Sequence, residues 1–249
     1  MLINPFMVAP AVDPALTLVL LHFDGADGST VFTDSSSYAR TFVRSGTSTA
    51  ISTANSKFGG SSLLSINGVQ GLAHYGTLGV LGADNWTVEG WFSQTEATTG
   101  TAQRGLFRLP NTTINHPIHV FIEAQKLHAE IAFAGESFTD FSHQTTTSVG
   151  TFMHWALVRN GDAITLYLNG VASVSTINAM GKAMLTHTDV FISRGLDTVA
   201  SSTTALNGYQ DEFRFRKEAV YTAEEIEGAH KNFLAIYGMA QDRTVIPLE

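Results

Sequence analysis

The feature that most constrains the fold is a pair of closely spaced Asn-Gly steps within residues 152–176. Asn160-Gly161 and Asn169-Gly170 are each flanked by residues that alternate between apolar and polar. Type I′ turns need a positive φ at both central positions, and Asn-Gly adopts this conformation at little steric cost. The segment is therefore expected to form three antiparallel strands joined by two tight turns.

The alternation within this segment also predicts which side chains face a core. Ile164, Leu166 and Leu168 share one face of the middle strand, because successive side chains of a strand point to opposite sides. Trp155 and Leu157 share a face of the preceding strand in the same way. We expect Trp155, Leu157 and Leu166 to be buried.

Short apolar segments separated by glycine-rich turns recur along most of the chain. Further strands are expected at residues 16–23, 41–44, 49–52, 62–66, 71–75, 85–93, 105–109, 118–123, 128–133, 138–143, 189–194 and 208–216. Strands of this length and spacing are typical of an antiparallel two-sheet sandwich.

The two ends of the chain depart from this pattern. Residues 222–240 are expected to form a helix, because Thr222 and Glu225 stand in capping-box register. Residues 1–15 hold three prolines, which exclude a helix or a central strand and predict an extended arm. The apolar side chains of this arm, expected to pack against a sister subunit or another protein, are Leu2, Ile3, Phe6, Met7 and Val8. The expected division is an arm at 1–15, one domain at 16–221, and a helix with a tail at 222–249.

Composition excludes several classes of protein. The 249 residues include 14 Lys and Arg against 22 Asp and Glu, and the net charge of −8 argues against a nucleic-acid partner. The chain has no cysteine, so it forms no disulfide and carries no thiolate. No apolar run is long enough for a membrane span, and the first residues lack the basic segment of a signal peptide.

Three blocks in fixed order resemble a known family. They are residues 20–37, which contain Phe-Asp-Gly, residues 86–93 together with 154–171, and residues 209–221, which contain Asp-Glu-x-Arg. Together they resemble the laminin-G-like, concanavalin A-like jelly-roll domain, in a version frequent in bacteriophage virion proteins. The resemblance implies an all-β fold of two packed antiparallel sheets over residues 16–221, with the arm and the helix outside it.

The same resemblance implies a calcium site. Relatives of this fold can hold a structural calcium ion between an early loop and a late strand, and the resemblance places Asp24 and Asp211 at those positions. Asp27 and Asp34 offer further hard oxygen ligands. The alternative is that the three early aspartates make Asx-turns and that Asp211 caps a strand. No other cofactor is expected.

Enzymatic activity is not expected. Glu89 and Glu123 lie on predicted strands, but the closely spaced Glu-x-Asp-x-x-Glu pattern of glycan-cleaving jelly-roll enzymes is absent. No Gly-x-Ser-x-Gly nucleophile motif is present. Among the nine histidines, His116 and His119 lie at a loop-to-strand junction without a tight metal-ligand motif, so the sequence favours ordinary polar roles for them.

One tryptophan is a candidate for stacking on a sugar. Trp91 lies on the opposite face of its strand from Trp86, so it is the better candidate for an exposed ring. The alternative is that all three tryptophans, including Trp155, are buried.

Two functions follow from these features. The first is a non-enzymatic structural protein of a tailed bacteriophage virion, either a capsid decoration or cement protein or a tail-associated protein. Its partners would be sister subunits and other virion proteins, and it would be made in the host cytoplasm and located in the virion. The alternative is a carbohydrate-binding adhesion module that recognises a cell-surface glycan.

Overall fold

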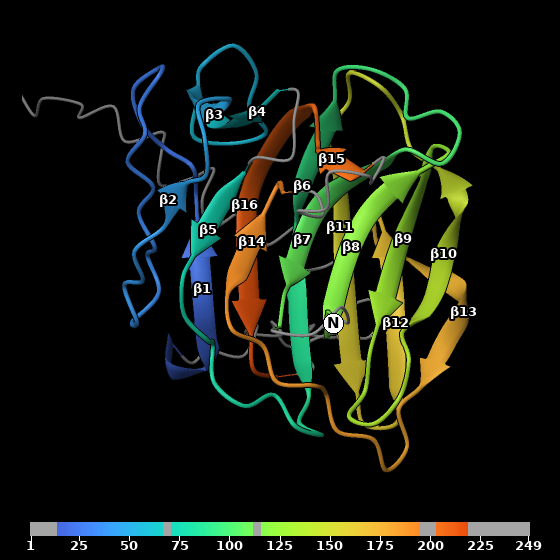
Figure 1. Cartoon of the computed structure of the whole chain (residues 1–249). Helices are drawn as coiled ribbons and strands as arrows, with labels where there is room; N and C mark the ends of the chain where they lie inside the picture. The colour runs from blue at the N-terminus through green and yellow to red at the C-terminus, as the bar shows by residue number, and fades with distance from the viewer. Residues whose placement is uncertain (1–13, 67–70, 112–115, 195–202, 219–249) are drawn as a thin grey trace, which may run out of the picture.

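The computed structural model describes residues 14–66, 71–111, 116–194 and 203–218. These residues form two β-sheets packed face to face, as the resemblance predicted (Figure 1). They include one short 3-10 helix, Pro14–Leu16, and no α-helix. None of their helices is long and apolar enough to cross a membrane. The expected arm up to residue 13 and the expected helix at 222–240 lie outside the described residues, so both stay predictions.

Among the described residues, each sheet has eight strands. Sheet 1 runs in spatial order through β13 (Val171–Asn178), β12 (Ala163–Leu168), β11 (Met153–Asn160), β6 (Trp86–Gln94), β16 (Gly208–Arg216), β4 (Ser62–Ser65) and β3 (Thr49–Ser52), and β1 (Thr17–Leu21) also pairs with β16. Sheet 2 runs through β10 (Thr139–Thr146), β9 (Lys126–Ile131), β8 (Ile118–Glu123), β7 (Gln103–Leu109), β14 (Val190–Ile192), β5 (Leu72–His74) and β2 (Val43–Arg44), and β15 (Thr203–Ala205) also pairs with β7. The short β15, which no sequence pattern indicated, pairs parallel, whereas the other paired strands are antiparallel.

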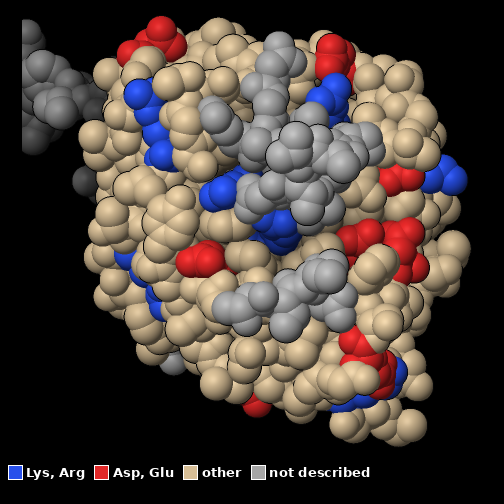
Figure 2. Space-filling model, viewed as in Figure 1, with Lys and Arg blue, Asp and Glu red and all other residues tan. Residues whose placement is uncertain are grey.

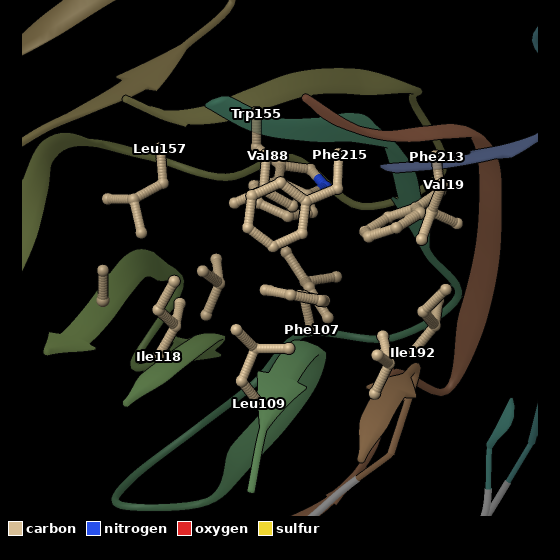
Figure 3. Packing of buried hydrophobic residues seen from close by; sticks show 14 of the residues in the cluster. Val19, Val88, Phe107, Leu109, Ile118, Trp155, Leu157, Ile192, Phe213 and Phe215 are labelled. Carbon is tan, nitrogen blue, oxygen red and sulfur yellow. The ribbon is translucent and has the colours of Figure 1, made fainter. Parts of the chain in front are cut away.

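The inner faces of the two sheets form one apolar core. The ring of Phe107, from sheet 2, lies 5.3 Å from that of Phe213 and 5.8 Å from that of Phe215, both from sheet 1. Figure 3 shows side chains of both sheets pointing toward one another around these rings. Trp155, Leu157 and Leu166 are fully buried in this core, which confirms the alternation predicted for β11 and β12.

One of the two predicted turns differs from the expectation. Asn169 and Gly170 have φ values of 50° and 80°, the positive pair that a type I′ turn requires. In the first turn, however, Asn160 is already paired with Ala163, so the central residues are Gly161 and Asp162. Gly161 alone has a positive φ, 57°, which matches a type II′ turn. The expected placement of Asn160 at the turn centre was wrong by one residue, because β11 extends to Asn160.

A buried arginine joins the core strands to the surrounding loops. Arg159 faces the core side of β11, where its guanidinium donates hydrogen bonds to four backbone carbonyl oxygens. The acceptors are Gly82 at 3.1 Å, Gly161 at 3.4 Å, Ala179 at 3.2 Å and Lys182 at 2.6 Å. A buried cation is tolerated when its donors are satisfied, so this arginine has a structural role.

Candidate functional site

A row of polar side chains crosses the outer face of sheet 2. Antiparallel register places one residue of each strand directly opposite the next: Asp140 on β10, Glu130 on β9, His119 on β8, Arg108 on β7 and Phe191 on β14. Their chain neighbours face the core, so these five side chains point away from it. Directly opposite residues on one face lie within contact distance, so the register alone assembles this outer-face row.

The row is divided by charge. Figure 2 shows basic side chains near the middle of this face and acidic ones toward the side of β9 and β10. At the basic end, the guanidinium carbons of Arg108 and Arg194 lie 5.1 and 3.9 Å from the centre of the Phe191 ring. These are cation–π distances, so the aromatic ring holds two cations on one side of the face.

His116, which precedes β8, converges with two members of the row, His119 and Glu130. Nε2 of His116 lies 2.6 Å from Oε2 of Glu130, and Nδ1 of His119 lies 3.4 Å from the same oxygen. The two imidazole rings are 4.9 Å apart in an edge-to-face arrangement. His119 is fully buried and stacks on Phe121 at 4.6 Å. The sequence analysis gave these histidines no joint role, whereas the structure brings them together.

The surroundings fix the charge of two members of this cluster. Burial acts to raise the pKa of Glu130, but the hydrogen bonds with His116 and His119 outweigh it and lower that pKa to about 2. Burial lowers the pKa of His119 to about 4, and the charges of His116 and Arg108 act in the same direction, against the hydrogen bond with Glu130. At neutral pH Glu130 is therefore ionised and His119 is neutral.

An exposed aromatic ring lies beside the acidic end of the row. Phe138 is 47% exposed, and its ring lies 6.1 Å from that of His116, nearly parallel to it. Close by, Nδ1 of His128 lies 3.2 Å from Oδ1 of Asp140, and His128 stacks on Phe121. We call the group formed by His116, His128, Phe138 and Asp140 the Phe138 rim. It combines an accessible apolar ring with groups that donate and accept hydrogen bonds.

The predicted calcium ligands belong to the part of the chain around sheet 1, with Asp211 on β16 and Asp24 in the loop after β1. Oδ2 of Asp211 accepts hydrogen bonds from the backbone N–H groups of Lys57 at 2.8 Å and Phe58 at 3.0 Å. A Cβ at Gly59 would overlap the carboxylate of Asp24, so Asp24 lies against the same loop. The structure thus brings Asp24 and Asp211, from distant parts of the sequence, to one loop at residues 57–59.

One oxygen of Asp211 fits a bound cation. Its Oδ1 is buried and has no hydrogen-bond partner among the described residues. Burial raises the pKa of Asp211 to about 8, and the charges of Glu212 and Asp24 add to the rise, against the hydrogen bonds from the loop. A calcium ion would supply the missing partner and neutralise these carboxylates, so the residues present fit the ion. The calcium site stays a prediction.

The two other early aspartates, Asp27 and Asp34, accept hydrogen bonds from backbone N–H groups. Asp34 accepts hydrogen bonds from the backbone N–H groups of Leu20, Ser36 and Arg40. Asp27 accepts one from the N–H of Thr53. The bond from Ser36, two residues after Asp34, is the Asx-turn that the sequence analysis gave as its alternative.

Comparison with known proteins identifies the family. A family model described as the concanavalin A-like lectin/glucanases superfamily, laminin G type, matches residues 58–227. The chain belongs to this family. A search of curated proteins found no match.

Solved structures with the same fold share little sequence with this concanavalin A-like domain. The binding domain of Paraclostridial Mosquitocidal Protein 1 is 13% identical with a TM-score of 0.64, covering 89% of this chain and 53% of its own. The ligand-binding domain of botulinum neurotoxin serotype D, in complex with N-acetylneuraminic acid, is 12% identical with a TM-score of 0.65, covering 88% and 51%. Domain 4 of AbnA, an arabinanase from Geobacillus stearothermophilus, in complex with arabinotriose, is 17% identical with a TM-score of 0.61, covering 85% and 97%. This chain thus spans about half the length of the two toxin domains.

In this concanavalin A-like domain, Trp91 lies under another part of the chain. It faces away from the core, opposite to Trp86, as predicted, but it is only 5% exposed. Nζ of Lys57 lies 4.4 Å from the centre of the Trp91 ring, and Phe58 meets its edge at 5.7 Å. A sugar would reach this ring only if the loop that Asp211 holds moved away.

The two glutamates considered for catalysis lie in different sheets and have different hydrogen-bond partners. Glu89 accepts hydrogen bonds from the guanidinium of Arg214, and its Oε2 lies 3.2 Å from Nε2 of His154. Burial acts to raise the pKa of Glu89, but Arg214 and His154 outweigh it and lower that pKa to about 2. Glu123 lies at the end of β8 on the other sheet and accepts a hydrogen bond from Gln103. The fold does not bring Glu89 and Glu123 together as a pair, because they belong to different sheets.

Proposed function

We propose that this chain is a non-catalytic carbohydrate-binding module and that the Phe138 rim is its binding surface. The observation that carries the proposal is the exposed ring of Phe138 beside the His128–Asp140 pair on the outer face of sheet 2. Small-molecule sites typically combine aromatic side chains with a few placed polar groups.

This combination of groups matches the chemistry of a sugar. The C–H groups on one face of a pyranose pack against an aromatic ring, while its hydroxyls donate to a carboxylate and exchange hydrogen bonds with imidazole. Phe138 supplies the first contact, and Asp140 and His128 supply the second. The sugar-bound structures of similar fold, the AbnA domain with arabinotriose and the neurotoxin domain with N-acetylneuraminic acid, support the same class of ligand.

The carboxylates of this face do not favour hydrolysis. Glycan-cleaving enzymes need a general acid that keeps its proton near neutral pH, which requires a raised pKa. Glu130, the buried carboxylate of the row, has its pKa lowered to about 2. We therefore propose binding without cleavage.

The test is a glycan array probed with the full chain. The best ligand is then titrated by calorimetry against the unchanged chain, the Phe138→Ala variant and the Tyr75→Ala variant. Phe138→Ala should weaken binding about 2- to 10-fold, the range expected for losing one aromatic contact of ~0.5–1.5 kcal/mol. Tyr75→Ala is the matched control, because Tyr75 is also an exposed aromatic of sheet 2 but lies next to β5, away from the rim. Equal affinity of Phe138→Ala and the unchanged chain would refute the assignment of the rim.

A place in a bacteriophage virion is compatible with this proposal but rests on the sequence resemblance alone. Removal of the arm separates the two roles. A chain that starts at Ala15 should retain glycan binding, and it should lose assembly with sister subunits or virion particles if the arm makes those contacts. Particle binding at full strength by the shortened chain would refute the role of the arm.

A further inference from the structure

We propose that His116, His119 and Glu130 form a binding site for a divalent transition metal ion of the zinc class. The site combines His119 and Glu130 of the outer-face row of sheet 2 with His116, which precedes β8, and the proposal does not depend on glycan binding. One ligand atom from each residue lies within 4.8 Å of the other two. All three side chains are buried, so their donor atoms are held in place by the surrounding strands.

The spacing of the donor atoms suits a tetrahedral ion. Ligand atoms about 2.0–2.1 Å from a tetrahedral zinc lie about 3.3 Å from one another. Nδ1 of His119 and Oε2 of Glu130 are 3.4 Å apart, a long hydrogen bond but the spacing of two ligands on one ion. Nε2 of His116, now 2.6 Å from Oε2 of Glu130, would have to move outward by about 0.7 Å to join them.

The hydrogen bonding of His119 determines which of its ring nitrogens carries the proton. Nε2 of His119 is buried and has no hydrogen-bond partner among the described residues. A neutral imidazole carries its proton on only one nitrogen. If Nδ1 holds the proton, the lone pair of Nε2 is buried without a donor; if Nε2 holds it, the lone pair of Nδ1 faces a carboxylate oxygen with no proton between them. A metal ion between His119 and Glu130 would bind the Nδ1 lone pair of the second tautomer, whose Nε2–H group has no acceptor among the described residues.

The donor set selects the class of metal. Two imidazoles and one carboxylate suit zinc and neighbouring transition metals, whereas calcium requires six to eight oxygen ligands. Three protein ligands leave the fourth tetrahedral position for a water molecule or an external ligand.

Some charged side chains around the cluster oppose cation binding and others favour it. Arg108 stands directly opposite His119, and its positive charge opposes cation binding. Its guanidinium, however, lies beside the Phe191 ring, on the side of the row away from Glu130. Asp140 stands directly opposite Glu130 and adds negative charge on the other side. A divalent ion between His119 and Glu130 would thus lie on the acidic half of the row.

The test uses the full chain, stripped with a chelator and dialysed, and titrated with zinc in a calorimeter. We expect one tightly bound ion per chain, and a rise of the melting temperature that saturates at the same ratio. Cobalt added in place of zinc should give the visible absorption of a tetrahedral complex with nitrogen and oxygen ligands. Because this spectrum needs no substitution, it tests the site even where a variant folds poorly.

Substitutions then assign the ion to these residues. Glu130→Gln and His116→Asn should each lower the zinc affinity at least 10-fold, with circular dichroism to verify the fold. His74→Asn is the control, because His74 lies on β5 of the same sheet and outside the cluster. Asp211→Asn should leave zinc binding unchanged, since Asp211 belongs to sheet 1.

Two results would overturn the proposal. One is the absence of stoichiometric zinc binding by the unchanged chain together with no tetrahedral cobalt spectrum. The other is zinc binding that survives both Glu130→Gln and His116→Asn, which would place the ion elsewhere. In either case the three side chains form only a hydrogen-bonded cluster, and the glycan test on Phe138 would stand unaffected.

Discussion

Calcium binding at Asp211 should release about one proton per ion at pH 7. The carboxyl of Asp211 is buried beneath the loop at residues 57–59, and its pKa is raised to about 8. At pH 7 such a group is about 90% protonated. A calcium ligand must be ionised, so an ion that binds there displaces this proton.

The raised pKa also sets the sign of a pH effect on stability in the absence of calcium. The unfolded chain loses the Asp211 proton above pH 3.8, whereas the folded chain keeps it up to about pH 8. The stability that this group contributes is therefore fully present below pH 3.8 and is lost as the pH rises through 8. The slope for one such proton is about 1.4 kcal/mol per pH unit, and bound calcium should remove it by holding the carboxylate ionised.

The assay is calorimetric titration of chelator-treated chain with calcium in two buffers of different protonation enthalpy, with melting temperatures measured in parallel. The difference in apparent enthalpy between the buffers gives the number of protons released. Chelation should lower the melting temperature, and Asp211→Ala should abolish that shift.

A conservative variant isolates the charge of Asp211. Asp211→Asn keeps the shape of the side chain, and its amide oxygen can still accept the hydrogen bonds from Lys57 and Phe58. This variant should remove both the proton release and the calcium-dependent melting shift. Asp162→Asn, in the exposed turn after β11, is the matched control and should change neither. Calcium binding without proton release, or no effect of chelator on the isolated protein, would rule out Asp211 as a ligand.

Two further predictions concern the core and the acid side of the stability profile. Leu166→Ala removes a fully buried side chain from the core and should lower the free energy of unfolding by ~2–5 kcal/mol in urea denaturation, whereas a loss under ~0.5 kcal/mol would contradict the assigned register. Nε2 of His187 accepts a hydrogen bond from the N–H of Leu78 at 2.8 Å, and burial lowers the His187 pKa from 6.5 to about 4. The stability that His187 contributes is therefore fully present above pH 6.5 and is lost as the pH falls through 4. Over this range the free energy of unfolding changes by roughly 1.4 kcal/mol per pH unit. In melting curves recorded from pH 4 to 7, His187→Gln should flatten this dependence, and an unchanged slope would contradict the role of His187.

Local sequence pattern determined the strands and their inner faces. The alternation of β11 and β12 was sufficient to predict that Trp155, Leu157 and Leu166 are buried, because the side-chain period of a strand is two whatever its partners. The type I′ turn at Asn169-Gly170 was equally local, since it depends on the φ angles of two residues. The first turn was misplaced by one residue because the length of β11 depends on its pairing with β12 and β6.

The surroundings of the outward-facing residues came only from tertiary structure. Trp91 was assigned to the correct face of β6, but the loop that covers it comes from residues 57–58 and is held by Asp211, 153 residues after Phe58. Alternation specifies the direction in which a side chain points. It does not specify which distant segment packs over it.

The cluster of His116, His119 and Glu130 shows the same limit most clearly. The short spacing of the two histidines was visible, but Glu130 joins them only through the register of β8 with β9. A shift of this register by one residue would turn Glu130 to the other face of the sheet. The sequence by itself determined that the chain forms strands with one apolar face, because that depends on neighbouring residues alone. Which polar groups meet on the outer face was decided by strand pairing, since pairing joins residues that have no local pattern in common.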